Sequence, residues 1–210
     1  MKNETSQKSG QVSESGQEVK SGIVFLKGHR VILRPIMESD LPTIVRWIND
    51  PRVRQYIKTI FPVTEAGERE WLASLAKKSD KDVVVAIEVD GKAIGNMGIH
   101  RINWKDRTAT TGAIIGEVEY WGKGYGTDAK MVLLDYAFNT LNLRKLMSHV
   151  YAFNERSLAY SLRCGYKVEA RLRKQRFVNG RYYDEIILGL FKKDWLKAKK
   201  AYDAKQKKRS

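Results

Sequence analysis

Residues 114–129, which read IIGEVEYWGKGYGTDA, decide how this chain of 210 residues folds. A strand pattern ends at Ile115, glycine then occupies every second position from Gly122 to Gly126, and a helical pattern begins at Thr127. Glycine lets the main chain adopt a positive φ and approach a ligand without a Cβ in the way. Successive N–H groups beside a helix N-terminus form a binding site for phosphate. The stretch therefore predicts a strand-to-helix turn that holds a phosphorylated ligand.

The spacing of these glycines excludes two common nucleotide sites. A Walker loop needs four residues between its first glycine and a Gly-Lys pair, which Ser or Thr must follow. Here five residues separate Gly116 from Gly122, and Lys123 is followed by Gly124. A dinucleotide-binding fold needs G-x-G-x-x-G near the start of its βαβ unit, whereas this motif reads G-x-G-x-G and lies late in the chain. Another phosphorylated ligand is therefore expected.

Outward from this turn, the hydrophobic pattern predicts an α/β domain with the order β-α-α-β-β-β-α-β-α-β-β. Asp90-Gly91 and Asn179-Gly180 are typical of two-residue turns between antiparallel strands. The expected strands span residues 30–36, 83–89, 93–102, 108–115, 145–152, 166–177 and 181–191. The expected helices span residues 39–49, 62–76, 127–141 and 154–165. The fold class that follows is a mixed, mostly antiparallel sheet with helices on both faces.

Composition divides the chain into three parts. Residues 1–22 are rich in Ser, Gly, Glu, Gln and Lys, and they predict a disordered tail because they offer almost no apolar surface to bury. Residues 23–191 form the expected domain. Residues 192–210 hold nine Lys or Arg against Asp194 and Asp203 and supply much of the net charge of +15. This last part predicts a solvated basic helix or tail.

The apolar runs, the single cysteine and the histidines together predict a cytoplasmic protein without a membrane span or a metal site. The longest apolar runs are strand-sized, and the N-terminus lacks the apolar segment of a secretory signal. The single cysteine, Cys164, cannot form an internal disulfide and is expected to pack in the domain. His29, His100 and His149 lie on different expected elements without the spacing of metal ligands.

Two motifs together resemble the GNAT superfamily of N-acetyltransferases. The pyrophosphate loop of that family reads Gln/Arg-x-x-Gly-x-Gly/Ala, and Trp121-x-x-Gly124-x-Gly126 matches it except at the first position. Residues 154–157, Asn-Glu-Arg-Ser, with Gly-Tyr at 165–166, are similar to the family's Asn-x-x-Ala/Ser helix that ends in Gly-Phe/Tyr. The branch that this chain resembles is that of the ribosomal-protein alanine and diamine acetyltransferases, which often end in a similar hairpin.

The resemblance implies that acetyl-CoA is the co-substrate and that no metal takes part. Family members splay two central strands and insert the pantetheine arm between them, so the strand over 112–115 is expected to pair with the pantetheine amides. A main-chain N–H near Ile115 would then polarise the thioester oxygen. Lys123 is expected to compensate for Trp121 at the first motif position. The residues implied to bind acetyl-CoA are Ile114, Ile115, Trp121, Gly122, Lys123, Gly124, Tyr125, Gly126, Thr127, Asn154 and Ser157.

Acetyl transfer also needs a proton donor for the departing thiolate. Many relatives place a tyrosine seven residues after the motif asparagine, and this chain has Ser161 there, with Tyr160 beside it. Ser157 and Ser161 lie four apart and share a helix face, so Ser161 is the predicted catalytic residue and Tyr160 is assigned to packing. The general base stays open among Glu117, Glu119, His100 and Asp184.

Without a strong base, the pKa of the acceptor matters. An α-amine with a pKa of about 8 is partly neutral at physiological pH, whereas a lysine-type amine is almost fully charged. We therefore expect an N-acetyltransferase acting on a primary amine of a small molecule or protein, with an α-amine or amino sugar favoured over a polyamine. The alternative is a basic RNA- or ribosome-binding module on the same fold, docked through residues 192–210. A homodimer is compatible with both.

Overall fold

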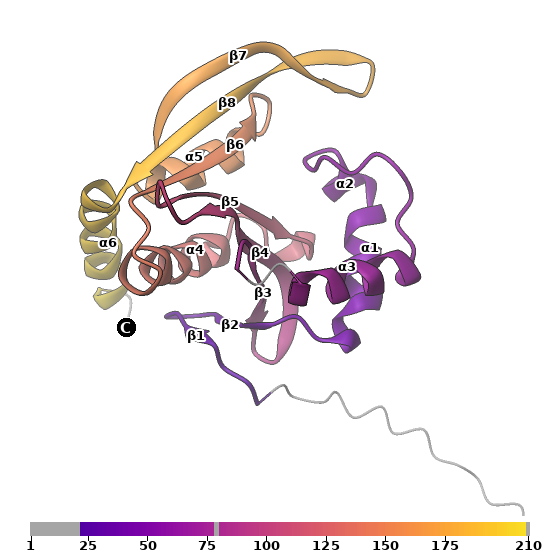
Figure 1. The fold of residues 1–210 in the computed structure, drawn as a ribbon, viewed down its shortest axis with the longest axis horizontal. Helices are drawn as coiled ribbons and strands as arrows, with labels where there is room; N and C mark the ends of the chain where they lie inside the picture. The colour runs from indigo at the N-terminus through magenta and orange to yellow at the C-terminus, as the bar shows by residue number, and fades with distance from the viewer. Residues whose placement is uncertain (1–21, 78–79, 209–210) are drawn as a thin grey trace, which may run out of the picture.

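An eight-stranded sheet forms the centre of the fold in a computed structural model that describes residues 22–77 and 80–208 (Figure 1). The strands are β1 (Leu26–Lys27), β2 (Ile32–Pro35), β3 (Val83–Val89), β4 (Lys92–Asn103), β5 (Thr108–Ile115), β6 (Lys145–Tyr151), β7 (Lys167–Val178) and β8 (Arg181–Phe191). They lie in the order β1-β2-β3-β4-β5-β6-β8-β7, in which β5 and β6 are parallel and the other described pairs antiparallel. The predicted fold class is confirmed. Residues 1–21 of the predicted tail lie outside the described residues.

Tight turns join the antiparallel strands where the sequence predicts them. Asp90 and Gly91, between β3 and β4, have φ angles of 50° and 82°. Asn179 and Gly180, between β7 and β8, have φ angles of 48° and 79°. Two consecutive residues with positive φ give the turn a twist that matches the paired strands, and Asn, Asp and Gly adopt this conformation at the least cost. The bounds of β3, β5 and β8 agree with the expected ranges.

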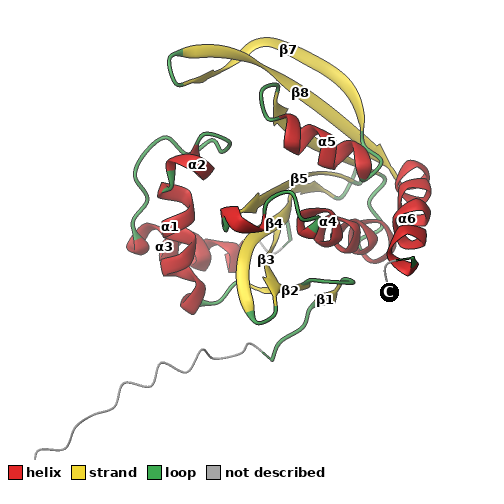
Figure 2. Cartoon of the chain, turned by 180° about the vertical axis from the view of Figure 1, so that it is seen from behind, coloured by secondary structure: helices red, strands yellow, loops and turns green. Residues whose placement is uncertain are grey.

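Helices cover both faces of the sheet, because alternate residues of its strands face two separate cores (Figure 2). On β3, Val85, Ile87 and Val89 face the larger core, while Val84 and Ala86 face the smaller one. The helices are α1 (Leu41–Asn49), α2 (Pro51–Arg54), α3 (Glu65–Lys77), α4 (Tyr125–Asp135), α5 (Glu155–Arg163) and α6 (Lys192–Lys207). The larger core includes side chains of α4, α5 and α6, and the smaller core those of α1 and α3.

The helix after the glycine turn has different bounds from those expected. It begins at Tyr125 rather than at Thr127, because Gly124, with a φ of 90°, is its N-cap. Regular α-helix ends at Asp135, and a π-helical turn, Tyr136–Thr140, completes the expected segment. The glycine turn therefore leads directly into the N-terminus of α4.

The basic C-terminal segment is a helix, α6, which was one of the two expected forms, but one side of this helix packs on the domain instead of being solvated. Trp195 is 1% exposed and lies in the larger core, where its ring centre is 5.4 Å from that of Phe138. Burying a side chain of this size stabilises a fold by about 2–3 kcal/mol. Asp194 accepts a hydrogen bond from Lys167 of β7 across 2.8 Å. Neither α6 nor another helix of the described ranges is long and apolar enough to cross a membrane.

Candidate active site

The parallel strands β5 and β6 separate part-way along their length. Residues 108–110 pair with residues 145–147. Beyond that point β5 follows β4 as far as Ile115, while β6 follows β8 as far as Tyr151. The gap between the two strands opens into a cavity of about 840 Å³, which residues 111–115 line from the open edge of β5. The splay of two central strands that the resemblance implied is therefore present.

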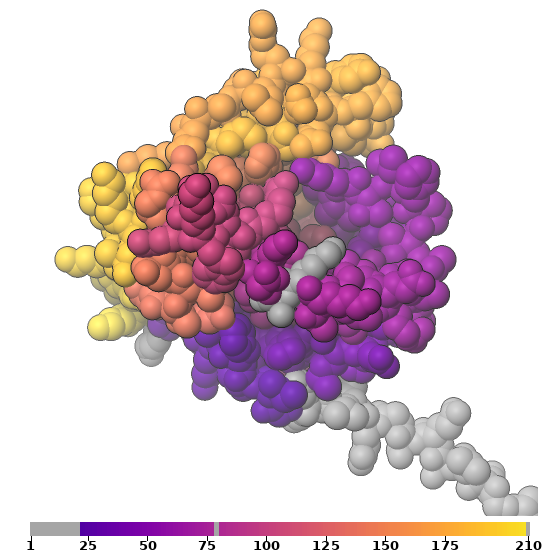
Figure 3. All heavy atoms as spheres, in the orientation of Figure 1, coloured from indigo at the N-terminus to yellow at the C-terminus, as the bar shows by residue number. Residues whose placement is uncertain are grey.

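The cavity passes through the sheet, because its walls come from elements on both faces. Lys130 of α4, Tyr160 of α5 and Lys205 of α6 line it from one face. Tyr56 and Lys58, in the segment after α2, line it from the other. Figure 3 shows a hollow between this purple segment and the orange β7–β8 hairpin. Two ligands can therefore enter from opposite faces and meet between β5 and β6.

The glycine turn has the geometry of an anion site. Gly122 and Gly124 have φ angles of 75° and 90°, which residues with a Cβ rarely adopt. Because Gly124 is the N-cap of α4, the N–H groups of Tyr125 and Gly126 have no partner within the helix, whereas the N–H of Thr127 already donates to the carbonyl oxygen of Gly124. Arg30 Nη1 donates to the carbonyl oxygen of Lys123 across 2.8 Å, and the Arg30 guanidinium lies 4.0 Å from the centre of the Tyr125 ring. Arg30, which sequence reasoning missed, thus adds a second cation to the turn.

Trp121, at the motif position where the family has Gln or Arg, closes the end of the open β5 edge. Its indole Nε1 donates to the carbonyl oxygen of Ile115 across 2.7 Å. The Arg156 guanidinium lies 3.8 Å from the centre of the Trp121 ring system, and the Tyr56 ring meets it edge-on at 6.2 Å. The N–H and C=O of a strand residue point to the same edge, so the N–H of Ile115 also points towards this side.

The predicted co-substrate residues lie around the cavity with one exception. Tyr125 does not line it and packs against Arg30 instead. Asn154 caps α5, because its Oδ1 accepts the main-chain N–H of Ser157 across 3.1 Å. The predicted residues that line the cavity are Ile114, Ile115, Trp121, Gly122, Lys123, Gly124, Gly126, Thr127, Asn154 and Ser157. Their contacts with acetyl-CoA stay predictions.

A family model described as an acetyltransferase (GNAT) domain matches residues 30–167 of the chain. The chain belongs to the GNAT acetyltransferase family. Spermidine N(1)-acetyltransferase of Escherichia coli K12 is 30% identical over 173 residues, which are 80% of this chain and 89% of that protein. The Vibrio cholerae spermidine N(1)-acetyltransferase is 36% identical over 156 residues, or 74% of this chain and 89% of that protein.

A solved structure extends this similarity to the fold. The Vibrio cholerae spermidine N-acetyltransferase in complex with CoA and spermine superposes on this chain with a TM-score of 0.74 at 26% identity. The match covers 80% of this chain and 98% of that one. This GNAT protein is an acetyl-CoA-dependent N-acetyltransferase, as the two sequence motifs predicted.

In this GNAT enzyme Tyr160, rather than Ser161, faces the cavity. Ser161 is fully buried outside the lining, and its hydroxyl has no hydrogen-bond partner in the described structure. Tyr160 lines the cavity together with Ser157. On a helix, a residue is close to the residues three and four positions further on, so both Tyr160 and Ser161 lie near Ser157. Packing rotates α5 so that Tyr160, and not Ser161, shares the cavity-facing side with Ser157. The expected position of Ser161 beside the thioester is therefore corrected.

Lys130 is a buried cation that sequence reasoning missed. It is 1% exposed, and its Nζ donates to Thr111 Oγ1 across 2.8 Å, close to the point where β5 and β6 separate. Thr111 Oγ1 also lies 2.7 Å from the hydroxyl of Tyr166. The ring centres of Tyr160 and Tyr166 lie 5.5 Å and 5.2 Å from Nζ. Burial lowers the pKa of Lys130 to about 8, so this ammonium is a stronger acid than an exposed lysine.

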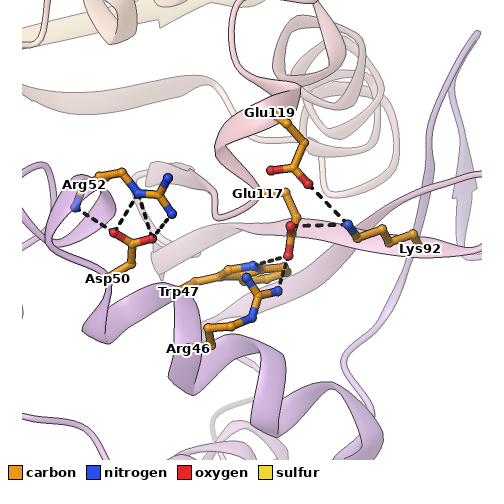
Figure 4. Close-up of polar contacts among 7 residues, drawn as sticks. All are labelled: Arg46, Trp47, Asp50, Arg52, Lys92, Glu117 and Glu119. Carbon is orange, nitrogen blue, oxygen red and sulfur yellow. Dashed lines mark hydrogen bonds and ion pairs between the residues drawn. The ribbon is translucent and has the colours of Figure 1, made fainter.

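The residues among which the general base was left open do not line the cavity. Glu117 accepts a hydrogen bond from Trp47 Nε1 across 2.7 Å and pairs with Arg46 and Lys92 (Figure 4). Burial would raise the pKa of Glu117, but these donors outweigh burial and lower it to about 2. The other three also have ion-pair partners: Glu119 with Lys92, His100 with Asp82, and Asp184 with Arg171.

His149 of β6 does line the cavity, although its sequence context did not single it out as a base. Its Nδ1 lies 3.5 Å from Oε1 of Glu185 on β8. Glu185 is 2% exposed and accepts hydrogen bonds from Arg176 Nη2 across 2.7 Å and 2.8 Å. Pairing of β6 with β8 brings the imidazole and the carboxylate together. Because the two residues are far apart in sequence, no local motif predicts that they meet.

Proposed function

We propose that this enzyme transfers the acetyl group of acetyl-CoA directly to a primary amine that enters from the α2 side of the sheet. The observation that carries the proposal is the continuous cavity, which joins the glycine turn to Tyr56 and Lys58 on the opposite face. A cavity that receives both substrates allows direct attack without an acetylated enzyme. The single cysteine, Cys164, is buried, and burial raises the pKa of its thiol to about 12, which makes it a poor nucleophile.

The co-substrate would occupy the half of the cavity that adjoins the glycine turn. Its diphosphate would accept hydrogen bonds from the N–H groups of residues 122–126, with Arg30 and Lys123 supplying positive charge. The pantetheine arm would run along the open edge of β5 towards Asn154 and Ser157. A main-chain N–H on the open edge of β5 near Thr111, further from the glycine turn than Ile115, would polarise the thioester carbonyl as negative charge develops on its oxygen.

Lys130 is the proton donor that we propose for the departing thiolate. Burial raises the pKa of Tyr160 well above that of a free phenol, so its hydroxyl is a weak acid. The pKa of Lys130, at about 8, is close to the value of about 8.5 typical of a thiol. An ammonium with this pKa both stabilises the thiolate and can transfer a proton to it. This role replaces the one predicted for Ser161.

The acceptor that the cavity favours is an amine without further positive charge, such as the α-amine of an amino acid or peptide. The described lining contains no aspartate or glutamate, while Lys58 and Arg156 face the acceptor side. A polyamine would place its ammonium groups against these cations without a carboxylate to pair with. An acceptor with a carboxylate or another anionic group near its amine would instead be attracted.

An acceptor panel tests the proposal by measuring CoA release from acetyl-CoA. We expect amino acids and peptides with an acidic second residue to react at least about tenfold faster, in kcat/KM, than spermidine or an aminoglycoside. Lys58→Glu should raise the rate with spermidine, while Lys105→Glu, at an exposed position outside the lining, should leave all rates unchanged. Spermidine as the best substrate of the wild-type enzyme would overturn the acceptor preference. Failure of every amine would overturn the transfer itself.

RNA or ribosome proximity, a homodimer and a cytoplasmic location remain predictions. Deleting residues 192–210 would not test the RNA alternative cleanly, because Trp195 is part of the core. Substituting the exposed Lys193, Lys200 and Lys207 by glutamine removes positive charge without removing packing. If α6 docks on RNA, this variant should lose salt-sensitive RNA binding while keeping acetyl transfer to a small amine.

A further inference from the structure

The ionisable side chains that line the cavity fall into three groups. The first group is the lysines and arginines, such as Lys58, Lys130 and Arg156, which are residue types that carry positive charge. The second group is the tyrosines, such as Tyr56 and Tyr160, which are weak acids and poor bases, and the third is a histidine. No carboxylate is found in the described lining, and His149 is the side chain there that is basic and whose ordinary pKa of about 6.5 leaves it mainly neutral at pH 7.

The setting of His149 matches that of a general base. Its imidazole lies on the acceptor side, since residues alternate along β6 and Ser148 and Val150 point into the opposite, buried side. Nδ1 faces the carboxylate of Glu185 at 3.5 Å, and this contact favours the tautomer with the proton on Nδ1 and the lone pair on Nε2. Two hydrogen bonds from Arg176 hold that carboxylate in place.

We infer that His149 is the general base of acetyl transfer and that Glu185 is the residue that positions it. The inference rests on the proposed function. As the amine nitrogen forms its bond to the thioester carbonyl carbon, its proton passes to Nε2 of His149. The C–S bond then breaks with its electron pair on sulfur, and the thiolate takes a proton from Lys130. His149 afterwards gives its proton to water and Lys130 regains one from water, so the net products are the acetylated amine and CoA.

The charged groups around the imidazole set the expected pH dependence. Those that face it are Glu185 of β8, Lys58 from the segment after α2, and Arg101 of β4, with Arg176 of β7 behind Glu185. Burial lowers the pKa of His149 below 6.5, Glu185 opposes this, and the two cations reinforce it. The imidazole is therefore neutral and ready to accept a proton at pH 7.

The test measures kcat/KM against pH with an acceptor amine of pKa about 5, so that ionisation of the acceptor does not shape the profile. The wild-type profile should fall at low pH with an apparent pKa below 6.5. His149→Gln should lose this acidic limb and about 10²–10⁴-fold in kcat, yet bind acetyl-CoA as tightly as the wild type. Imidazole in the buffer should restore part of the activity of His149→Ala. His29→Gln, at an exposed histidine outside the lining, is the matched control.

A measurement that does not depend on catalysis tests whether Glu185 positions His149 or only stabilises the fold. In NMR titrations the His149 imidazole should have a pKa below that of a free histidine, and Glu185→Gln should lower it further because the opposing carboxylate is gone. Two results would overturn the inference. One is a His149→Gln enzyme that keeps the acidic limb and a kcat close to that of the wild type. The other is a His149 imidazole whose pKa is the same in the wild type and in Glu185→Gln. A wild-type enzyme that binds acetyl-CoA but acetylates no amine would overturn the proposed function itself, and this inference with it.

Discussion

The hydroxyl of Tyr202 donates a hydrogen bond to Oδ1 of Asp128 across 2.8 Å and so ties α6 to the first turn of α4. The same carboxylate accepts main-chain N–H groups from Arg30 and Val31, across 2.6 Å and 3.1 Å. Asp128 thus holds together the glycine turn's helix, the loop that carries Arg30, and α6. Removing the side chain of Asp128 would leave these three donors without their acceptor, and the N–H of Val31 would be left unpaired at a buried position.

Tyr202→Phe removes the α6 contact alone. A hydrogen bond to a charged group contributes about 1.5–3 kcal/mol, so we expect the free energy of unfolding to fall by about 1–2 kcal/mol in urea denaturation at this half-buried site. Affinity for acetyl-CoA should fall as well, because Tyr202 and Lys205 of α6 both line the cavity. Tyr182→Phe, at an exposed hairpin tyrosine, is the control. Equal stability of the two variants would show that the Asp128 contact does not hold α6.

Lys130→Met should stabilise the fold while slowing the reaction. The pKa of Lys130 falls from 10.5 to about 8 on folding, so the buried ammonium costs stability below pH 8, and this cost disappears as pH rises from 8 to 10.5. At pH 7 the cost is on the order of 3 kcal/mol, and methionine avoids it. Urea denaturation should therefore show a more stable variant at pH 7 and a smaller difference at pH 10. A variant that gains stability and keeps full kcat would refute the role of Lys130 as proton donor.

Glu117→Gln should destabilise the enzyme without abolishing catalysis. The pKa of Glu117 is lowered from 4.5 to about 2, so the folded state gains stability from its charge above pH 4.5 and loses it as pH falls towards 2. At pH 7 we expect a loss on the order of 2–3 kcal/mol. The difference between the variant and the wild type should shrink at pH 3. A large loss of kcat in a folded Glu117→Gln enzyme would contradict this prediction and would indicate that Glu117 is the general base.

Local patterns predicted the sheet well. The strands β3, β5 and β8 have the expected bounds, because short β-branched runs are bounded there by Gly-containing turns such as Asp90-Gly91. The splay of β5 from β6 and the residues around the glycine turn followed from two motifs that each occupy a few consecutive positions. These features depend on residues that are close together in the sequence, so they can be predicted from the sequence alone.

The groups that we assign to proton transfer could not be predicted in this way. Lys130 follows a helical pattern like any other lysine, and its burial depends on Thr111 and Tyr166. The pair of His149 and Glu185 depends on the pairing of β6 with β8. Ser161 was misplaced because the rotation of α5 is decided by packing rather than by the spacing of its serines.

The central claim is that main-chain N–H groups of the glycine turn bind the diphosphate of acetyl-CoA, and calorimetry of acetyl-CoA binding tests it most directly. Gly124→Glu places a carboxylate at the turn, and Gly180→Glu makes the same change at a hairpin glycine with a similar φ, 79° against 90°. We predict that Gly180→Glu binds as the wild type does, while Gly124→Glu binds at least about 100-fold more weakly. Equal affinity of the two variants would contradict the claim.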